Sequence, residues 1–303
     1  MTRFPHDQFA KDYLEELLAP LGEVQAPRRV AGEVRQIDVW FAPARPTVAN
    51  AQTLGLLGRF AATPSLFEPF RNPATPTDIC NCLLKLLELR GECDREANRN
   101  QQRLEEDNLP RLWILTPTAS ASVLHGFGAI VDEVNWLPGI HFLASYLRTA
   151  IVAIHQLPRN QETLWLRILG REKVQEQAIE ELAALPQNHP LRGNVIKLVT
   201  NLNANLQADN ENLDEEDREL VMKFSPLYEQ WREEALQEGE QLGIQREKRV
   251  IIENLIKVRF GALDEQLSAI VEPLWLLPSE EFTRLLLQLS REELLARFGG
   301  SRL

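Results

Sequence analysis

The sequence predicts an α/β fold, with a mixed β-sheet in the N-terminal domain and an all-α region after it. Short apolar segments with strand character alternate with helical segments as far as residue 158, a pattern typical of sheets with crossover helices. From residue 160 onward, apolar residues recur at helical spacing. Leu112–Thr116 is almost continuously apolar, as expected for a strand that is covered on both faces.

The first predicted element is a helix over Asp7–Leu18. Phe9, Tyr13 and Leu17 are spaced four residues apart and would share one face of that helix. Asp7 stands at the start, where its carboxylate can accept a hydrogen bond from an unpaired backbone N–H. The segment is therefore predicted to cover the sheet with its apolar face.

Two strands are predicted next, at Glu23–Ala26 and Gly32–Ala42. In the second strand, successive side chains should point to opposite faces, so that Asp38 lies on one face while apolar side chains lie on both. One face should carry three apolar side chains: Ile37, Val39 and Phe41. This is the pattern of a central strand that bears a single carboxylate.

The sheet should continue with several short strands around one long helix. A strand over Leu66–Arg71 would contain Pro69, which lacks a ladder donor and so predicts a sheet edge or a bulge. Thr77–Leu104 is predicted to be a long helix, and further strands are expected at Gly139–Leu143 and Thr149–His155. The sheet is predicted to contain about four to six strands.

The rest of the chain is predicted to be helical. The expected helices are Glu162–Leu185, Leu191–Leu206, Glu215–Arg259, Leu267–Leu277, Glu280–Leu289 and Glu292–Phe298. A capping box at Ser290 and Glu293 marks the start of the last one.

Charge and periodicity divide the chain into four parts. Residues 1–206 carry 21 Lys and Arg against 23 Asp and Glu, whereas residues 207–303 carry 12 against 21. We expect an α/β domain over 1–158, a helical extension over 159–206, an acidic linker and charged helix over 207–248, and a C-terminal helical domain over 249–303. The near-neutral first part leaves room for a basic groove, so the net charge of −11 does not exclude a nucleic-acid partner.

Several classes of protein are disfavoured by the sequence. It has no run of about 18 apolar residues that would span a membrane, and its first residues do not form a secretory signal. We therefore expect a cytoplasmic protein without a membrane partner. Cys80, Cys82 and Cys93 lack the spacing of a zinc site and are expected to be reduced.

Asp38 and Glu68 are the candidate functional carboxylates, because each lies in an apolar segment. A buried carboxylate needs a cationic partner. For Asp38 the alternatives are a salt bridge, for instance to Arg35 or Arg28, a position near the end of a strand, and a divalent cation as the partner. If the two segments form neighbouring strands, Asp38 and Glu68 would converge on one Mg²⁺, which prefers carboxylate and water ligands.

A third acid for this site is available on the first helix. Glu15 or Glu16 would assist Asp38 and Glu68 if its side chain faces the sheet. Alternatively, both glutamates belong to a solvated helix face.

The order of helix, strand, Asp-bearing strand, Glu-bearing strand, long helix and strand resembles the PD-(D/E)XK nuclease fold. Three segments resemble the recombination-promoting nuclease group, which includes transposase-like proteins: His6–Lys11, Glu33–Val39 and Leu157–Gly170. Residues 250–298 are similar to a C-terminal helical domain of unknown function that occurs chiefly in cyanobacterial proteins. Together these segments span most of the chain.

The resemblance implies an endonuclease of mobile elements that depends on Mg²⁺, or alternatively Mn²⁺, and acts on DNA. Asp38 takes the place of the metal-binding Asp, and Glu68 that of the acid in the (D/E)-x-K element. The residue two positions after Glu68 is Phe70 rather than Lys. Lys85 or Arg71 would have to supply the missing positive charge, and without it the chain would be a degenerate, inactive member.

The alternative function is that of a non-catalytic interaction protein. The last three predicted helices carry dense apolar stripes within residues 249–303. These helices would either pack on each other and on the long charged helix, or mediate a homo-oligomer or the docking of a helical protein partner.

Overall fold

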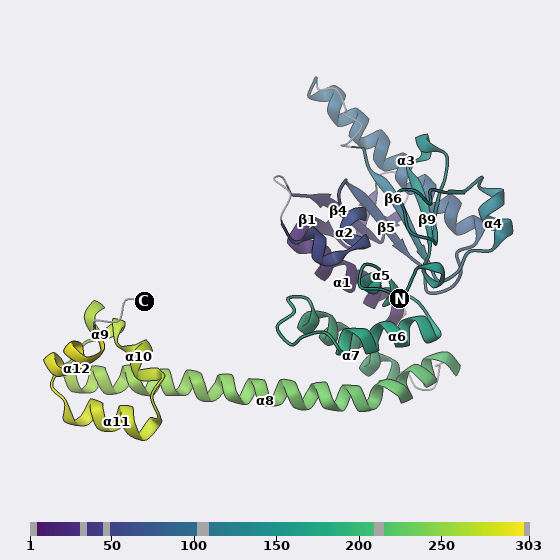
Figure 1. The fold of residues 1–303 in the computed structure, drawn as a ribbon. Coiled ribbons are helices and arrows are strands. Elements are labelled where there is room, and N and C mark those ends of the chain that lie inside the picture. The colour runs from purple at the N-terminus through teal and green to yellow at the C-terminus, as the bar shows by residue number, and fades with distance from the viewer. Residues whose placement is uncertain (1–4, 31–34, 45–48, 102–108, 209–214, 300–303) are drawn as a thin grey trace. The chain divides into compact units, whose positions relative to one another are not determined.

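The computed structural model describes residues 5–30, 35–44, 49–101, 109–208 and 215–299 (Figure 1). The chain forms two compact units, Met1–Ser225 and Pro226–Leu303. The first contains a mixed seven-stranded sheet, and the described part of the second is built from helices. The predicted α/β class, with an all-α region at the C-terminus, is confirmed.

The main sheet has the order β1-β4-β5-β6-β9-β8-β7. Neighbours are antiparallel from β1 to β5, parallel from β5 to β9, and antiparallel again from β9 to β7. Its strands are β1 Gly22–Gln25, β4 Val39–Pro43, β5 Ser65–Pro69, β6 Arg111–Thr116, β7 Ile130–Val131, β8 Ile140–Phe142 and β9 Thr149–Ala153. A second sheet pairs β2 (Arg28–Val30) with β3 (Arg35–Ile37).

Two strand predictions were wrong in detail. The chain bends at Asp38, so that the single strand predicted over Gly32–Ala42 is divided between two sheets, β3 and β4. The bend interrupts the alternation, and Ile37 packs in the same core cluster as Trp40 instead of sharing a face with Val39. The main sheet also has one strand more than predicted, because the two-residue β7 carries no clear sequence signal.

The predicted edge position of Pro69 was also wrong. β5 lies inside the sheet, between β4 and β6. Pro69 is the last residue of β5, and the next residue, Phe70, donates its backbone N–H to the Leu115 carbonyl at 2.7 Å. The ladder therefore continues past the proline without needing its missing donor.

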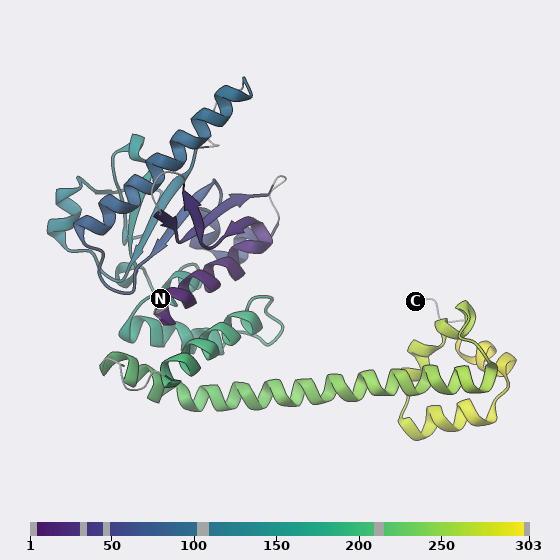
Figure 2. The same ribbon diagram turned by 180° about the vertical axis from the view of Figure 1, so that it is seen from behind.

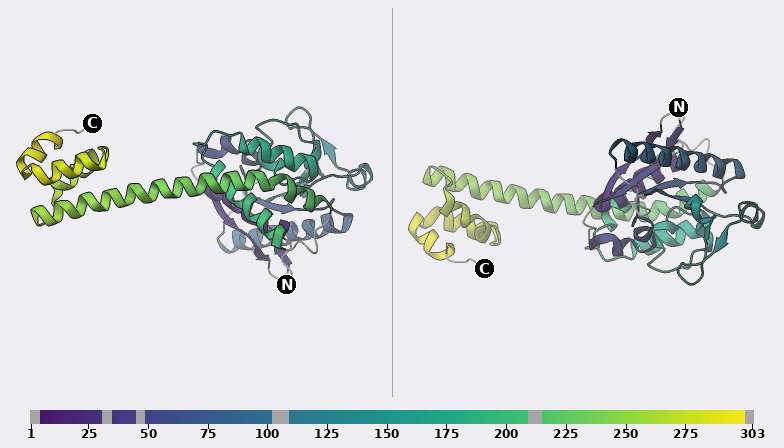
Figure 3. Two further views of the ribbon diagram at one scale, coloured as in Figure 1. Left: turned by 90° about the horizontal axis from the view of Figure 1, so that it is seen from below. Right: turned by 90° about the horizontal axis from the view of Figure 1, so that it is seen from above.

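The helices of the first unit lie on both faces of the sheet (Figure 3). They are α1 Pro5–Leu18, α2 Leu56–Phe60, α3 Pro76–Arg99, α4 Ala121–Gly126, α5 Leu164–Arg167, α6 Glu172–Ala183 and α7 Arg192–Ala208. Short 3₁₀ turns occur at Ala19–Leu21, Ala49–Leu54, Ser145–Leu147 and Ile154–Gln156. The long helix α8 (Glu215–Phe260) begins in the first unit and ends in the second.

One face of the sheet packs against α3, which crosses it in Figure 2. The sheet contributes Trp40, Leu66, Leu112, Ile114 and Ile151, and α3 contributes Ile79, Cys82, Leu86 and Leu89. On the opposite face, Phe60 stacks on Trp113 with ring centroids 3.8 Å apart. Both faces of the central strands are therefore covered, as their apolar sequence predicts.

The helices predicted over Glu162–Leu185 and Leu267–Leu277 are each interrupted. The first is divided into α5 and α6 around Gly170, where an added Cβ would lie 2.9 Å from the Arg167 carbonyl oxygen. The second is divided into α9 (Glu265–Ala269) and α10 (Val271–Trp275). Pro273 in α10 has no N–H to donate to the carbonyl four residues earlier, so a continuous helix cannot form there.

The second unit is completed by α11 (Ser279–Gln288) and α12 (Arg291–Phe298). The predicted capping box is present: Glu293 N donates to Ser290 Oγ at 3.3 Å and Ser290 N donates to Glu293 Oε2 at 2.8 Å. Ile252 and Ile256 of α8 pack in one core cluster with residues of α9 to α12. These helices therefore pack on each other and on the long helix, which is one of the two arrangements that the sequence allowed.

Replacing Leu66 by Ala should destabilise the first unit by about 2–5 kcal/mol, because the side chain is fully buried under α3. Leu84→Ala, at an exposed position of the same helix, is the control and should change stability by less than about 0.5 kcal/mol. Urea unfolding followed by tryptophan fluorescence measures both. Equal losses in the two variants would contradict the packing described for α3.

Candidate active site

Asp38 and Glu68 meet because β4 and β5 are antiparallel neighbours. In this ladder Val39 pairs with Phe67, so the next register position sets Asp38 opposite Glu68. The backbone N–H of Asp38 lies 3.4 Å from Glu68 Oε1. Strand pairing thus brings together two carboxylates that are 30 residues apart in the chain.

Glu68 is buried between the sheet and α3. Its side chain is 1% exposed. Glu68 follows Leu66 by two residues and therefore points to the same face of β5, which packs against α3. Lys85 of α3 donates from Nζ to Glu68 Oε2 at 2.6 Å, and Cys82 Sγ lies 3.9 Å from the same oxygen. Cys82 and Lys85 lie about one turn apart on α3, so the helix places a buried thiol and a cation beside Glu68.

Asp38 is paired by a residue that the sequence did not single out. Lys11 of α1 places Nζ 3.0 Å from Asp38 Oδ1 and 2.8 Å from Asp7 Oδ2. The i,i+4 spacing of Asp7 and Lys11 is visible in the sequence, but the approach of α1 to the bend at Asp38 is not. The partners expected from sequence, Arg35 and Arg28, have side chains outside the described part of the structure.

Burial and charge shift the proton affinity of this group. Burial of Glu68 and the negative charge of Asp38 raise the pKa of Glu68 to about 8, although Lys85 acts in the opposite direction. Burial acts to lower the pKa of Lys85, but the attraction of Glu68 outweighs it and the net shift is upward. Lys85 therefore remains a cation at neutral pH.

Three of the predicted site residues lie elsewhere. Glu15 is exposed on α1, and Glu16 accepts a hydrogen bond from Asn194 of α7. Arg71 donates to Asp217 Oδ1 at 2.8 Å and to Gln175 Oε1 at 3.1 Å, so its described contacts do not include Asp38 or Glu68. The structure thus pairs Lys85 with Glu68, whereas Arg71 is paired with Asp217.

The acid pair opens into two adjoining hollows that share Asp38, Phe70 and Asp78. The smaller, of about 360 Å³, is lined by Asp38, Glu68, Phe70, Asp78, Asn81, Cys82 and Lys85. The larger, of about 670 Å³, extends from Asp38 past His6, Arg71 and Asp217. We call the larger one the α1–α8 cleft. Asp38, whose side chain is 21% exposed, connects the buried pair to solvent.

A metal ion bound between Asp38 and Glu68 would have two protein carboxylates as ligands. Within residues 5–30, 35–44, 49–101, 109–208 and 215–299, no group of three or more His, Cys, Asp or Glu side chains is placed to hold a metal. Mg²⁺, however, is commonly held by one or two carboxylates together with waters and substrate phosphates. Burial, and after it the negative charge of Asp38, raise the pKa of Glu68, so a bound cation would have to displace a proton from this carboxyl. The carboxylates of Asp38 and Glu68 are thus donors of the type that Mg²⁺ prefers.

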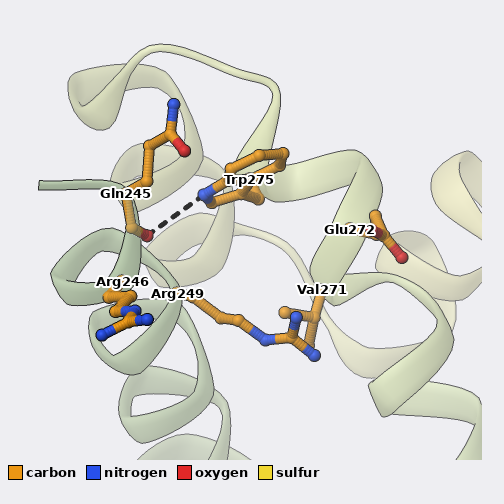
Figure 4. Close-up of a pocket in the computed structure, with 6 residues that line it drawn as sticks. All are labelled: Gln245, Arg246, Arg249, Val271, Glu272 and Trp275. Atoms are coloured by element: carbon orange, nitrogen blue, oxygen red, sulfur yellow. Dashed lines mark hydrogen bonds between the residues drawn. The ribbon is translucent and has the colours of Figure 1, made fainter. Parts of the chain in front are cut away.

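A further hollow lies in the second unit, between α8 and α10 (Figure 4). It measures about 180 Å³ and is lined by Gln245, Arg246, Arg249, Val271, Glu272 and Trp275. Trp275 closes one side by donating from Nε1 to the Gln245 carbonyl at 3.2 Å. This hollow has one carboxylate and lacks the paired acids of the first unit.

Comparison of the chain with protein-family models, curated proteins and solved structures found no match. Of the helices that the structure describes, none combines the length and the apolar character needed to cross a bilayer.

The raised pKa of Glu68 predicts a pH-dependent stability in metal-free buffer. Burial favours the protonated carboxyl, so this contribution is fully present below the ordinary value of 4.5 and is lost as the pH rises through about 8. Glu68→Gln keeps a neutral side chain, so the Tm of this variant minus that of the wild type should increase between about pH 5 and pH 8.5. Thermal unfolding in EDTA measures it.

Glu96→Gln, on the exposed side of α3, is the matched control. Its Tm relative to the wild type should not change with pH over this range. If the Tm difference from the wild type changed with pH equally in both variants, burial and the charge of Asp38 would not be raising the pKa of Glu68.

Proposed function

We propose that this protein is a metal-dependent nuclease that hydrolyses DNA phosphodiesters, with a core of the PD-(D/E)XK type. The observation that carries this proposal is the meeting of Asp38 and Glu68 across neighbouring strands, with Lys85 2.6 Å from Glu68. Two acids and one lysine, drawn from two strands and a helix, form a constellation suited to phosphoryl chemistry.

The arrangement of the core supports the proposal. α1 is followed by β1, β4, β5, α3 and β6, and these strands occupy neighbouring positions in the sheet. This order agrees with the one that the sequence resemblance implies, with the small β2–β3 sheet inserted before the Asp-bearing strand. Glu68 lies on β5, and Asp38 immediately precedes β4.

Lys85 is the residue that we assign to the role of the missing lysine. Phe70 occupies the position two residues after Glu68 and packs against the α3 core cluster. Lys85 reaches the same carboxylate from the facing helix, and its side chain is 15% exposed. A lysine from another element can serve the same purpose, because the effect of the positive charge depends on its location in the site and not on its position in the sequence.

Each residue of the site then has a role. Asp38 and Glu68 would hold the metal ion, which when bound polarises the scissile phosphate and lowers the pKa of water. Lys85 keeps a proton on Nζ and directs positive charge to the Glu68 side of the site. Lys11 orients Asp38 through its contact with Oδ1.

A non-catalytic interaction protein is the second candidate. The observation in its favour is that Asp38 and Glu68 already have lysine partners, at 3.0 Å and 2.6 Å. The paired charges would then be part of the structural core, and the helices after residue 249 would bind a second copy or a helical partner. Leu276 and Leu287 remain 75% and 61% exposed there.

The purified full chain should cleave DNA with Mg²⁺ or Mn²⁺, and Asp38→Asn should abolish cleavage. Lys85→Met should reduce the rate at least about 100-fold, because it removes a charge that acts on the transition state. Asp94→Asn on α3 and Lys173→Met on α6 are the controls, since both residues are exposed. Supercoiled, linear and single-stranded DNA should all be tested.

Cleavage that survives in Asp38→Asn would come from a contaminant and would contradict the proposal. Absence of cleavage by the wild type on all three substrates, with a normal circular dichroism spectrum, would favour the interaction protein.

The interaction candidate predicts self-association through the second unit. Replacing both Leu276 and Leu287 by Asp should convert an oligomer to a monomer, because it places charges in an apolar contact. Light scattering over a range of protein concentrations measures this. A wild-type chain that is monomeric throughout that range would remove the homo-oligomer as a candidate.

A further inference from the structure

Arg71 and His6 converge on one carboxylate in the α1–α8 cleft. Arg71 Nη2 and His6 Nε2 each lie 2.8 Å from Asp217 Oδ1. His6 comes from α1, Arg71 follows β5, and Asp217 belongs to the first turn of α8. Three elements that are distant in sequence thus meet around a single oxygen atom.

The guanidinium of Arg71 is held in a fixed orientation. Its Nη1 donates to the Gly170 carbonyl at 3.3 Å and to Gln175 Oε1 at 3.1 Å. Gln175 is 1% exposed and is itself held by a hydrogen bond to Ile168. With Nη1 occupied, the Nη2 end is directed at the position of Asp217. This arrangement is pre-organised to bind an oxyanion.

This position belongs to the same cleft as Asp38. His6, Asp38, Arg71 and Asp217 all contribute to its lining. Guanidinium groups bind carboxylate and phosphate oxygens with the same charge-assisted geometry. An anion that replaced Asp217 would leave the net charge of the site unchanged.

We propose that His6 and Arg71 form a phosphate-binding subsite for the DNA strand that enters the Asp38–Glu68 site, and that Asp217 occupies this subsite as an internal competitor. The proposal rests on the proposed nuclease function for the identity of the ligand. While Asp217 is bound to Arg71 and His6, its negative charge opposes the approach of a phosphate.

The competition predicts that Asp217→Asn binds DNA more tightly than the wild type. The gain should be about tenfold, because a charge-assisted contact becomes available to phosphate. The salt dependence should also steepen by about one in log K against log salt, as expected for one added phosphate contact. The probe is a fluorescein-labelled duplex of about 20 bp, with the full chain in EDTA to prevent cleavage.

Glu219→Gln is the matched control, because it removes one negative charge from an exposed position of the same helix turn. It should leave both affinity and salt slope near their wild-type values. Adding Arg71→Gln to Asp217→Asn should cancel the gain. Equal effects of Asp217→Asn and Glu219→Gln, or no effect of Asp217→Asn, would overturn the proposal.

Hydrogen exchange of the wild-type chain gives a test without substitution. Added DNA should displace Asp217 and speed exchange in the first turn of α8, while slower or unchanged exchange would contradict the subsite. The outcomes separate this proposal from the nuclease function. Asp38-dependent cleavage with unchanged DNA affinity in Asp217→Asn overturns only the subsite. Tighter, Arg71-dependent binding without any cleavage supports the subsite and contradicts only the catalytic function.

Discussion

The ion pair of Glu68 and Lys85, buried between the central sheet and α3, constrains the rest of the first unit. A carboxylate at 1% exposure needs a cation or a proton, and the helix supplies the cation from among core residues such as Cys82 and Leu86. The position of α3 on the sheet is therefore set by apolar packing and by charge together. Lys85 does not fully offset the effects of burial and of the Asp38 charge, which together still raise the pKa of Glu68 to about 8.

Asp38 connects this buried pair to the cleft because the backbone bends there. The bend ends β3 and begins β4, and it leaves Asp38 accessible to Lys11 and to solvent on the open side. Two acids and two lysines thus form a group whose one end is buried and whose other end is exposed. In the proposed nuclease, a metal ion would replace the Lys11 contact of Asp38 while Glu68 remains in place.

Much of this arrangement could be predicted from local sequence. Isolated acids in apolar strands identified Asp38 and Glu68, and the register of β4 and β5 set them opposite each other. Lys85 was one of two candidates, and its contact with Glu68 depends on which face of α3 packs on the sheet. Lys11 and the pairing of Arg71 with Asp217 were not predictable, because they depend on how α1 and α8 pack and involve residues up to 146 positions apart. The bend at Asp38 was missed because the alternation of side chains between two faces holds only for a regular strand.

The proposed nuclease function requires that Asp38 and Glu68 together hold one divalent cation. The most direct measurement is anomalous diffraction from crystals of the full chain soaked in Mn²⁺, beside crystals of the Asp38→Asn variant. We expect one manganese peak between the two carboxylates in the wild type, with Lys11 moved away from Asp38, and no peak in the variant. A site without manganese, in which Lys11 and Lys85 keep their ion pairs, would contradict it.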